Sequence, residues 1–318
     1  MDADTKPTTE TASSPDARLA RAVLSLEGLS VGDAFGERYF TSGADALIAA
    51  RTLARPPWHY TDDTQMALSV FSVLRQRRKI GRDALATNFS VHYEEDRGYG
   101  DAMNRLVPMI YLAGMWRMLA PRLFGGEGSL GNGAAMRVAP LGAYFADDPA
   151  RAAAQAARSA VVTHAHPEGV AGAVAVAAAA AHAARLYGQP PPFCADFLAL
   201  ILPHVPSGAV ADGLRLAAAL PPETTVREAA RLLGCGYNAT APDTVPFALW
   251  CAGRHLGDYE EALWLTASGL GDIDTTCAIV AVSAGAGSIP VAWATAREPL
   301  PRWPFEEVDG GEIDDADR

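Results

Sequence analysis

Apolar residues recur every three to four positions along most of this chain, which is the spacing of one face of an α-helix. The pattern is clear in Leu19, Ala22, Val23 and Leu26, and again in Leu106, Ile110, Leu112, Met115 and Leu119. Alternating segments typical of β-strands are scarce, and glycine and proline fall between the periodic segments. The sequence therefore predicts an all-α fold with about a dozen helices.

The two ends of the chain differ in composition from the body between them. Residues 1–16 are polar and lack the apolar stretch of a signal peptide, so we expect a disordered N-terminal tail. Residues 304–318 form an acidic C-terminal tail that supplies much of the net charge of −11. No stretch between them has the composition of a linker, which predicts a single domain over residues 17–303.

Charge and hydropathy exclude several classes of function. The body is mildly acidic, and its one basic cluster is Arg75–Lys79, so nonspecific nucleic-acid binding is not expected. The longest apolar stretch, residues 169–184, is mostly alanine and too short to span a bilayer, which favours a buried helix and no membrane partner. Four cysteines lie far apart without Cys-x-x-Cys spacing, namely Cys194, Cys235, Cys251 and Cys277. They are expected to be reduced core residues of a cytoplasmic protein.

Two short acidic clusters share one composition, Thr61-Asp62-Asp63 and Asp272-Ile273-Asp274-Thr275. Each offers hard carboxylate oxygens and a threonine hydroxyl, the donors that Mg²⁺, Mn²⁺ and Ca²⁺ prefer and Zn²⁺ does not. More than 200 residues separate the clusters, so they meet only across the core of a folded domain. The sequence thus predicts one metal site made of two halves. Each cluster also precedes an apolar helical pattern, so a plain helix-capping role stays open for both.

Two motifs match known catalytic patterns without the required context. Gly28-Leu29-Ser30-Val31-Gly32 has the form Gly-x-Ser-x-Gly, but it continues a helix instead of following a strand. Gly126-x-Gly128-x-x-Gly131 matches the dinucleotide fingerprint without a βαβ unit. The glycine-rich segment 125–133 is either a mobile loop or the entry to a helix whose N–H groups suit an anion such as a pyrophosphate.

Six segments, taken in order, resemble the motif series of the ADP-ribosylglycohydrolase family, which includes dinitrogenase reductase-activating glycohydrolase. They are Gly32-Asp33-Ala34-Phe35-Gly36, Thr61-Asp62-Asp63-Thr64, Gly98-Tyr99-Gly100, Gly131-Asn132-Gly133-Ala134-Ala135-Met136-Arg137, Thr163-His164 and Gly271-Asp272-Ile273-Asp274-Thr275. The resemblance covers roughly residues 17–295. It implies a compact orthogonal multi-helix domain that holds two Mg²⁺ or Mn²⁺ ions at the base of an ADP-ribose cleft.

The resemblance also implies roles for individual residues. The metal ligands would be Thr61, Asp62, Asp63, Asp272, Asp274 and Thr275. The substrate-binding residues would be Gly98, Tyr99, Gly100 and Asp101 near the distal ribose, Ser129, Gly131, Asn132, Gly133 and Met136 along the cleft, and His164 on its wall. Asp62 or Asp63 would accept the proton of the attacking water, and Asp274 would serve catalysis with them. The bond cleaved would join ADP-ribose to an acceptor on a protein, a nucleic acid or a small molecule, with ADP-ribose as product.

One departure from the family pattern concerns the substrate entrance. The family usually has a glutamate seven residues after the aspartate of Gly-Asp, and counting from Asp33 that position is Phe40. Glu37 is the nearest acid and the candidate for the missing carboxylate. Phe40 would make the entrance more apolar and stack on a planar acceptor. Leu130 also stands where many members carry an aromatic residue.

Three functions stay open on the sequence. The first is hydrolysis of an ADP-ribosyl linkage, which the intact acidic clusters favour. The second is an ADP-ribose-binding or structural protein without catalysis, which Phe40 favours. The third is a metal-dependent hydrolase acting on another nucleotide-linked compound. The acceptor, whether arginine, serine, a DNA base or a small molecule, is not specified, and a monomer is expected.

Overall fold

The computed structural model describes residues 13–111, 114–285 and 289–306, and within them it contains sixteen α-helices and no β-strand. The helices are α1 Pro15–Glu37, α2 Ala44–Ala49, α3 Asp62–Arg77, α4 Arg82–Val91, α5 Asp101–Leu106, α6 Trp116–Leu119, α7 Ala139–Tyr144, α8 Pro149–Ala160, α9 Pro167–Arg185, α10 Cys194–Ile201, α11 Ala209–Ala219, α12 Val226–Leu233, α13 Ala241–Arg254, α14 Tyr259–Ala267, α15 Ile273–Val280 and α16 Val291–Ala296. The all-α prediction is confirmed. Short helices such as α2 and α6 bring the number above the predicted dozen.

The two tails predicted from composition fall largely on residues 1–12 and 307–318, which lie outside the described residues. The described structure reaches into both. Helix α1 begins at Pro15, where the Ser14 hydroxyl caps it by accepting the N–H of Ala17 at 3.2 Å. At the other end Phe305 packs on Phe71 with ring centroids 5.3 Å apart.

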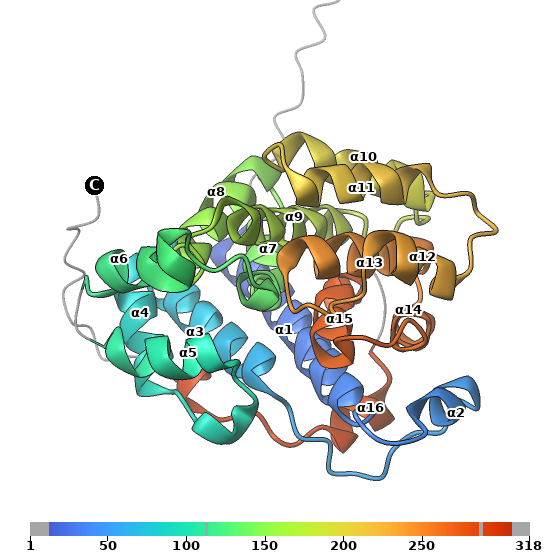
Figure 1. The fold of residues 1–318 in the computed structure, drawn as a ribbon, viewed down its shortest axis with the longest axis horizontal. Coiled ribbons are helices and arrows are strands. Elements are labelled where there is room, and N and C mark those ends of the chain that lie inside the picture. The colour runs from blue at the N-terminus through green and yellow to red at the C-terminus, as the bar shows by residue number, and fades with distance from the viewer. Residues whose placement is uncertain (1–12, 112–113, 286–288, 307–318) are drawn as a thin grey trace, which may run out of the picture.

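Helices α1 and α9 form the centre of the molecule. Helix α1 crosses the middle of the view in Figure 1 and packs against α3, α7 and α15. Its residues from Gly28 to Gly36 are all buried, as expected of a helix enclosed on every side. The alanine-rich stretch 169–184 lies in α9 and is almost wholly buried, which confirms the predicted core helix. None of the helices in the described part of the chain has both the length and the apolarity of a membrane span.

A stripe of glycines on α1 sets its distance from α15. Gly28, Gly32 and Gly36 are four residues apart and therefore share one face. A β-carbon at Gly32 would lie 2.4 Å from the Cys277 carbonyl oxygen, and one at Gly36 would lie 2.5 Å from the Ile273 carbonyl oxygen. The Gly-x-Ser-x-Gly match is thus part of a packing surface, as its helical context predicted.

The C-terminal segment closes over the chain that leads into α3. The Trp58 N–H donates to the Ala296 carbonyl at 2.7 Å, and the Glu298 N–H donates to the Trp58 carbonyl at 2.9 Å. Trp293 of α16 stacks on Phe35 of α1 with ring centroids 4.8 Å apart. The end of the described chain therefore holds residue 58, only three positions before the first acidic cluster.

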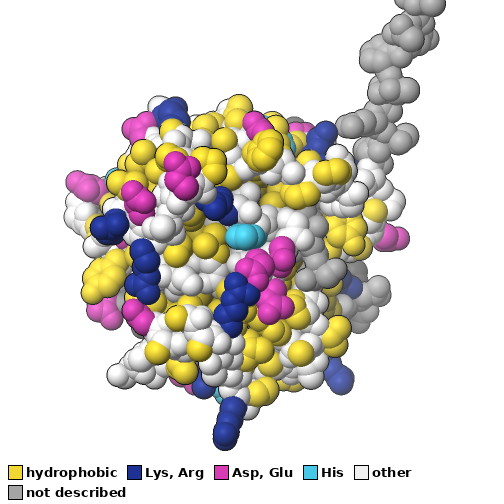
Figure 2. All heavy atoms as spheres, turned by 90° about the vertical axis from the view of Figure 1, so that its right-hand side faces the viewer, with side chains coloured by type: hydrophobic (Ala, Val, Ile, Leu, Met, Phe, Trp, Pro, Cys, Tyr) yellow, Lys and Arg dark blue, Asp and Glu magenta, His cyan; other side chains and the backbone are white. Residues whose placement is uncertain are grey.

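The surface charges and the cysteines agree with the predictions made from composition. Figure 2 shows one face on which basic and acidic side chains are interspersed among apolar ones, without a broad area of one sign. No cysteine forms a disulfide, and all four lie in the described residues. Cys251 and Cys277 are buried, whereas Cys194 and Cys235 are partly exposed.

Candidate metal centre

One carboxylate from each acidic cluster meets a third from α1. Ligand oxygens of Asp33, Asp63 and Asp274 all lie within 4.8 Å of one another. These residues belong to α1, α3 and α15, so the close packing of α1 on α15 brings the group together. The two acidic clusters thus lie side by side in the core, as their composition suggested.

Both clusters also occupy helix N-termini, although a side-chain capping bond is present only in the first. Thr61 is the N-cap of α3, and its hydroxyl accepts the N–H of Asp63 at 3.4 Å. Asp272 is the N-cap residue of α15 but makes no side-chain capping bond. Helix N-termini stabilise negative charge, which favours carboxylates at this junction.

Asp33 is the organiser of the first cluster. Its carboxylate accepts the N–H and the hydroxyl of Thr61, the latter at 2.8 Å, and the N–H and the hydroxyl of Thr64, at 3.0 and 2.5 Å. Burial raises the pKa of Asp33 to about 6, even though these hydrogen bonds act to lower it. Sequence reasoning did not include Asp33 among the metal ligands, although its place in the Gly-Asp motif pointed to it.

Asp63 carries the observation that best fits a bound cation. Its Oδ2 accepts the hydroxyls of Thr61 and Thr275 at 3.2 and 3.5 Å, but its Oδ1 is buried and has no hydrogen-bond partner. A buried, unpaired carboxylate oxygen costs free energy unless a cation or donor reaches it. None of the ion pairs among the described residues includes Asp33, Asp63 or Asp274. An all-oxygen donor set of this kind fits Mg²⁺ or Mn²⁺.

The pKa values of the clustered carboxylates reflect the same crowding. Burial first, and then the neighbouring carboxylates, raise the pKa of Asp62 to about 8. The same two causes hold the pKa values of Asp63 and Asp274 well above the ordinary range. The folded protein without metal therefore prefers these groups protonated, whereas metal binding requires them ionised.

The remaining predicted ligands flank the three-carboxylate group. Asp272 Oδ2 accepts the side-chain amide of Asn132 at 2.7 Å, and Asn132 also donates to Thr244 at 3.1 Å. Asp62 is half-buried, and a β-carbon at Gly98 would lie 3.9 Å from its Oδ1. Asp62 and Asp272 are therefore neighbours of the group but not members of it, and their ligand role stays a prediction.

The glycine-rich segment lies against His164. A β-carbon at Gly133 would lie 2.9 Å from the imidazole Cε1, and one at Gly131 would lie 3.2 Å from Nε2. His164 Nδ1 pairs with the Thr163 hydroxyl at 2.8 Å, and burial lowers the pKa of His164 to about 3, so the ring is neutral. Ser129 accepts the Gly131 N–H at 3.2 Å.

The glycine-rich segment 125–133 is mostly loop in this structure. It ends in a single 3₁₀ turn at Asn132–Ala134, and the next α-helix, α7, begins at Ala139. Met136 lies buried in the core just beyond. Further along the chain, His166 caps α9 by accepting the Glu168 N–H at 3.1 Å.

The segment 98–101, which the resemblance places near the distal ribose, divides between the core, the pocket and the surface. Tyr99 is buried, and its hydroxyl donates to Gln65 Oε1 at 2.7 Å, so the ring faces the core. Gly100 precedes α5, and Asp101 is its exposed first residue. Of the four, only Gly98 lines the pocket described next.

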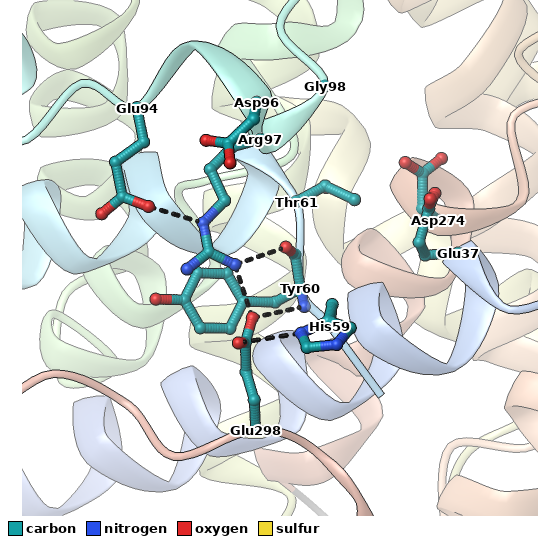
Figure 3. Close-up of a pocket in the computed structure, with 10 residues that line it drawn as sticks. All are labelled: Glu37, His59, Tyr60, Thr61, Glu94, Asp96, Arg97, Gly98, Asp274 and Glu298. Carbon is teal, nitrogen blue, oxygen red and sulfur yellow. Dashed lines mark hydrogen bonds and ion pairs between the residues drawn. The ribbon is translucent and has the colours of Figure 1, made fainter. Parts of the chain in front are cut away.

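A pocket of about 440 Å³ opens beside the three-carboxylate group (Figure 3). Its lining residues are Glu37, His59, Tyr60, Thr61, Glu94, Asp96, Arg97, Gly98, Asp274 and Glu298. Glu37 and Asp274 lie together on one side in Figure 3, and burial, followed by the charge of Asp33, raises the pKa of Glu37. Phe40 is 51% exposed and does not line the pocket. Of these two residues, only Glu37 lines this pocket, and its catalytic role stays a prediction.

Metal should stabilise the protein more strongly as pH rises. Because these carboxylate pKa values are raised in the folded state, the metal-free protein is most stable at pH values below the ordinary pKa of aspartate. It loses that stability as the pH rises toward and through the folded-state pKa values of about 6 and 8. Magnesium at 100 times its dissociation constant adds about 2.7 kcal/mol. We expect the difference in melting temperature between Mg²⁺ and EDTA to be larger at pH 8 than at pH 5.5. An equal difference at both pH values in a thermal-shift titration would contradict this assignment.

A sequence model of the family described as ADP-ribosylglycohydrolase matches residues 14–310. ADP-ribosylhydrolase ARH3 of Xenopus tropicalis is 33% identical over 150 residues, which are 46% of this chain and 41% of that protein. ADP-ribosylhydrolase ARH3 of Gallus gallus is 34% identical over 102 residues, or 31% of this chain and 28% of that protein. The matches thus span less than half the length of these curated relatives.

A solved structure is similar over most of both chains. It is described as an ADP-ribosylglycohydrolase-related protein complex, and it has a TM-score of 0.58 and 25% sequence identity. The alignment covers 89% of this chain and 94% of that one.

Proposed function

This chain belongs to the ADP-ribosylglycohydrolase family, and on that premise we propose that it is a metal-dependent hydrolase of the glycosidic bond between ADP-ribose and an acceptor. The supporting observation is the group formed by Asp33, Asp63 and Asp274, whose ligand oxygens lie within 4.8 Å of one another and in which one buried oxygen of Asp63 has no hydrogen-bond partner. A buried group of this kind is a poor device for stability alone, because three like charges repel.

The proposed cofactor is a pair of Mg²⁺ or Mn²⁺ ions. The residues that would hold them are Thr61, Asp62, Asp63, Asp272, Asp274 and Thr275, with Asp33 joining the group from α1. Bound divalent cations would polarise the ribose hydroxyls and stabilise the charge that develops as the glycosidic bond breaks. Asp33 fixes Thr61 and Thr64 by four donor groups, which keeps the first cluster in place.

Other residues of the chain would bind and orient the substrate. Gly131 and Gly133 let their segment pack closely on His164, whose neutral ring would add no charge beside a bound diphosphate. Asp62 lies close to Gly98, a lining residue of the pocket, and would accept the proton of the attacking water. Glu37, beside Asp274, supplies a carboxylate at the pocket entrance.

The position of Phe40 favours the catalytic proposal over the non-catalytic alternative. That alternative depended on Phe40 replacing an acidic residue at the entrance. Phe40 lies beyond the end of α1 and outside the pocket, whereas Glu37 is its last residue and lines the pocket. The stacking role expected for Phe40 has no support in this position.

Release of ADP-ribose from a panel of arginine-, serine- and base-linked substrates tests the proposal. We expect hydrolysis of at least one substrate, loss of that activity in EDTA, and recovery after Mg²⁺ or Mn²⁺ is restored. ADP-ribose binding without any hydrolysis in the presence of metal would support the non-catalytic alternative. Absence of both binding and hydrolysis would rule out ADP-ribose as a ligand of this site.

A further inference from the structure

Glu298 connects three parts of the chain beside the metal centre. Its Oε1 accepts the Tyr60 N–H at 3.1 Å and Arg97 Nη1 at 2.5 Å, and its Oε2 pairs with His59 Nδ1 at 3.0 Å. Figure 3 shows these contacts converging on one carboxylate. Burial alone would raise the pKa of Glu298, but the bonds from His59, Arg97 and the Tyr60 N–H hold it below its ordinary value. The carboxylate is therefore ionised and fully engaged.

The bond from the Tyr60 N–H to Glu298 holds the chain that enters α3. The chain from residue 58 to residue 61 is held by successive backbone donors. The Trp58 N–H bonds Ala296, the Tyr60 N–H bonds Glu298, and the Thr61 N–H bonds Asp33. Because Thr61 opens the first acidic cluster, Glu298 sets where that cluster begins.

The bond from Arg97 to Glu298 holds the opposite wall of the pocket. Arg97 ends the 3₁₀ turn Glu95–Arg97 and precedes Gly98, which faces Asp62 and Thr61. Besides binding Glu298, Arg97 Nη1 donates to the Tyr60 carbonyl at 3.1 Å, and its guanidinium lies 4.0 Å from the Tyr60 ring centre. Glu298 thus ties the 94–98 segment to the segment that enters α3.

We propose that Glu298 is a positioning residue of this site. By bonding Tyr60 and Arg97 together, it holds the first acidic cluster and Gly98 at the separation that metal and substrate binding require. Glu298 lies outside the acidic clusters and outside every motif of the sequence, so nothing in the linear pattern indicated it. The kinetic part of this inference rests on the proposed function, whereas its structural part does not.

The adjacent residue provides a matched control. Arg297 pairs with Glu27 of α1 at 2.8 Å and is largely buried, so Glu27→Gln weakens the docking of the same C-terminal segment. Glu27 is not among the residues that line the pocket. A purely structural effect of the segment would therefore appear in Glu27→Gln and Glu298→Gln alike.

Three readouts test the proposal on the full chain. The first is backbone hydrogen exchange over residues 58–64 and 94–100, the second is Mn²⁺ affinity, and the third is kcat and KM for the substrate found above. We expect Glu298→Gln to speed exchange in both segments, and to weaken Mn²⁺ affinity and kcat/KM by about 10- to 100-fold, as for other residues that orient metal ligands. Glu27→Gln should leave Mn²⁺ affinity and kcat/KM unchanged, and faster exchange should be confined to Trp58, whose N–H bonds Ala296 of the same segment.

Two outcomes would overturn the inference. One is equal loss of Mn²⁺ affinity in Glu298→Gln and Glu27→Gln, and the other is unchanged exchange in Glu298→Gln. If Glu298→Gln loses helix content, Arg97→Gln replaces it and should speed exchange in the 94–100 segment while residues 58–60 stay protected; unchanged exchange there would count against the proposal. If the natural protein releases no ADP-ribose, the proposed function fails, and exchange and Mn²⁺ affinity still decide the role of Glu298.

Discussion

Asp63→Asn and Asp274→Asn should each lower turnover by roughly a thousandfold or more while leaving the helices intact. Each exchange removes a charged oxygen ligand and with it several kcal/mol of charge stabilisation. The same exchange relieves repulsion in the metal-free protein, because burial and neighbouring carboxylates hold both pKa values well above the ordinary range. In EDTA the variants should therefore melt at the same temperature as the natural protein or higher, yet gain little from Mg²⁺. Turnover assays and thermal shifts in EDTA and in Mg²⁺ measure the three effects.

Glu260→Gln is the control for these variants, because Glu260 is an exposed acid in the first turn of α14. It should retain both activity and metal-dependent stabilisation. If both aspartate variants kept the turnover of the unmutated protein, metal-assisted catalysis at this site would be ruled out. A lowered melting temperature in EDTA would show instead that the carboxylates stabilise the fold.

Gly36→Ala should destabilise the protein by about 1–3 kcal/mol and weaken Mg²⁺ binding, although alanine is the better helix former by about 1 kcal/mol. A β-carbon at this position would lie 2.5 Å from the Ile273 carbonyl oxygen and 2.6 Å from the Asp274 Cα. These are backbone atoms that cannot rotate away, so α1 and α15 must separate and Asp274 must move. Chemical denaturation and a Mg²⁺ titration measure the two effects.

Gly81→Ala is the comparison for this variant. The nearest atom to its added β-carbon would be Cδ of Arg77 at 3.3 Å, in a flexible side chain that can shift. Gly81 is the N-cap of α4, where alanine is less favourable than glycine, so a loss of up to about 1 kcal/mol is expected, but Mg²⁺ binding should be unchanged. If Gly36→Ala were more stable than the natural protein, helix propensity would outweigh packing, and the glycine stripe would not set the position of Asp274.

The sequence determined the features that depend on neighbouring residues. Helical spacing predicted an all-α chain and the buried helix α9, and the two acidic clusters were placed correctly at helix starts. Their hard oxygen donors also predicted a shared site, because residue type limits which metals a site can hold. The helices and the meeting of the two clusters are confirmed, because a helical face and a helix start are defined within a few residues of chain, whereas the metals stay a proposal.

Only the tertiary structure decided which distant groups meet. Asp33 and Glu37 share a face of α1, four residues apart, whereas Phe40 lies past the end of that helix. Counting along the sequence pointed to Phe40, but the helix end at Glu37 determines which side chain reaches the pocket. Tyr99 turns to the core through its bond to Gln65, and Glu298 reaches the site from a segment more than 200 residues away from Tyr60. Such contacts follow from how helices pack, and packing depends on the whole chain at once, so no local pattern specifies them.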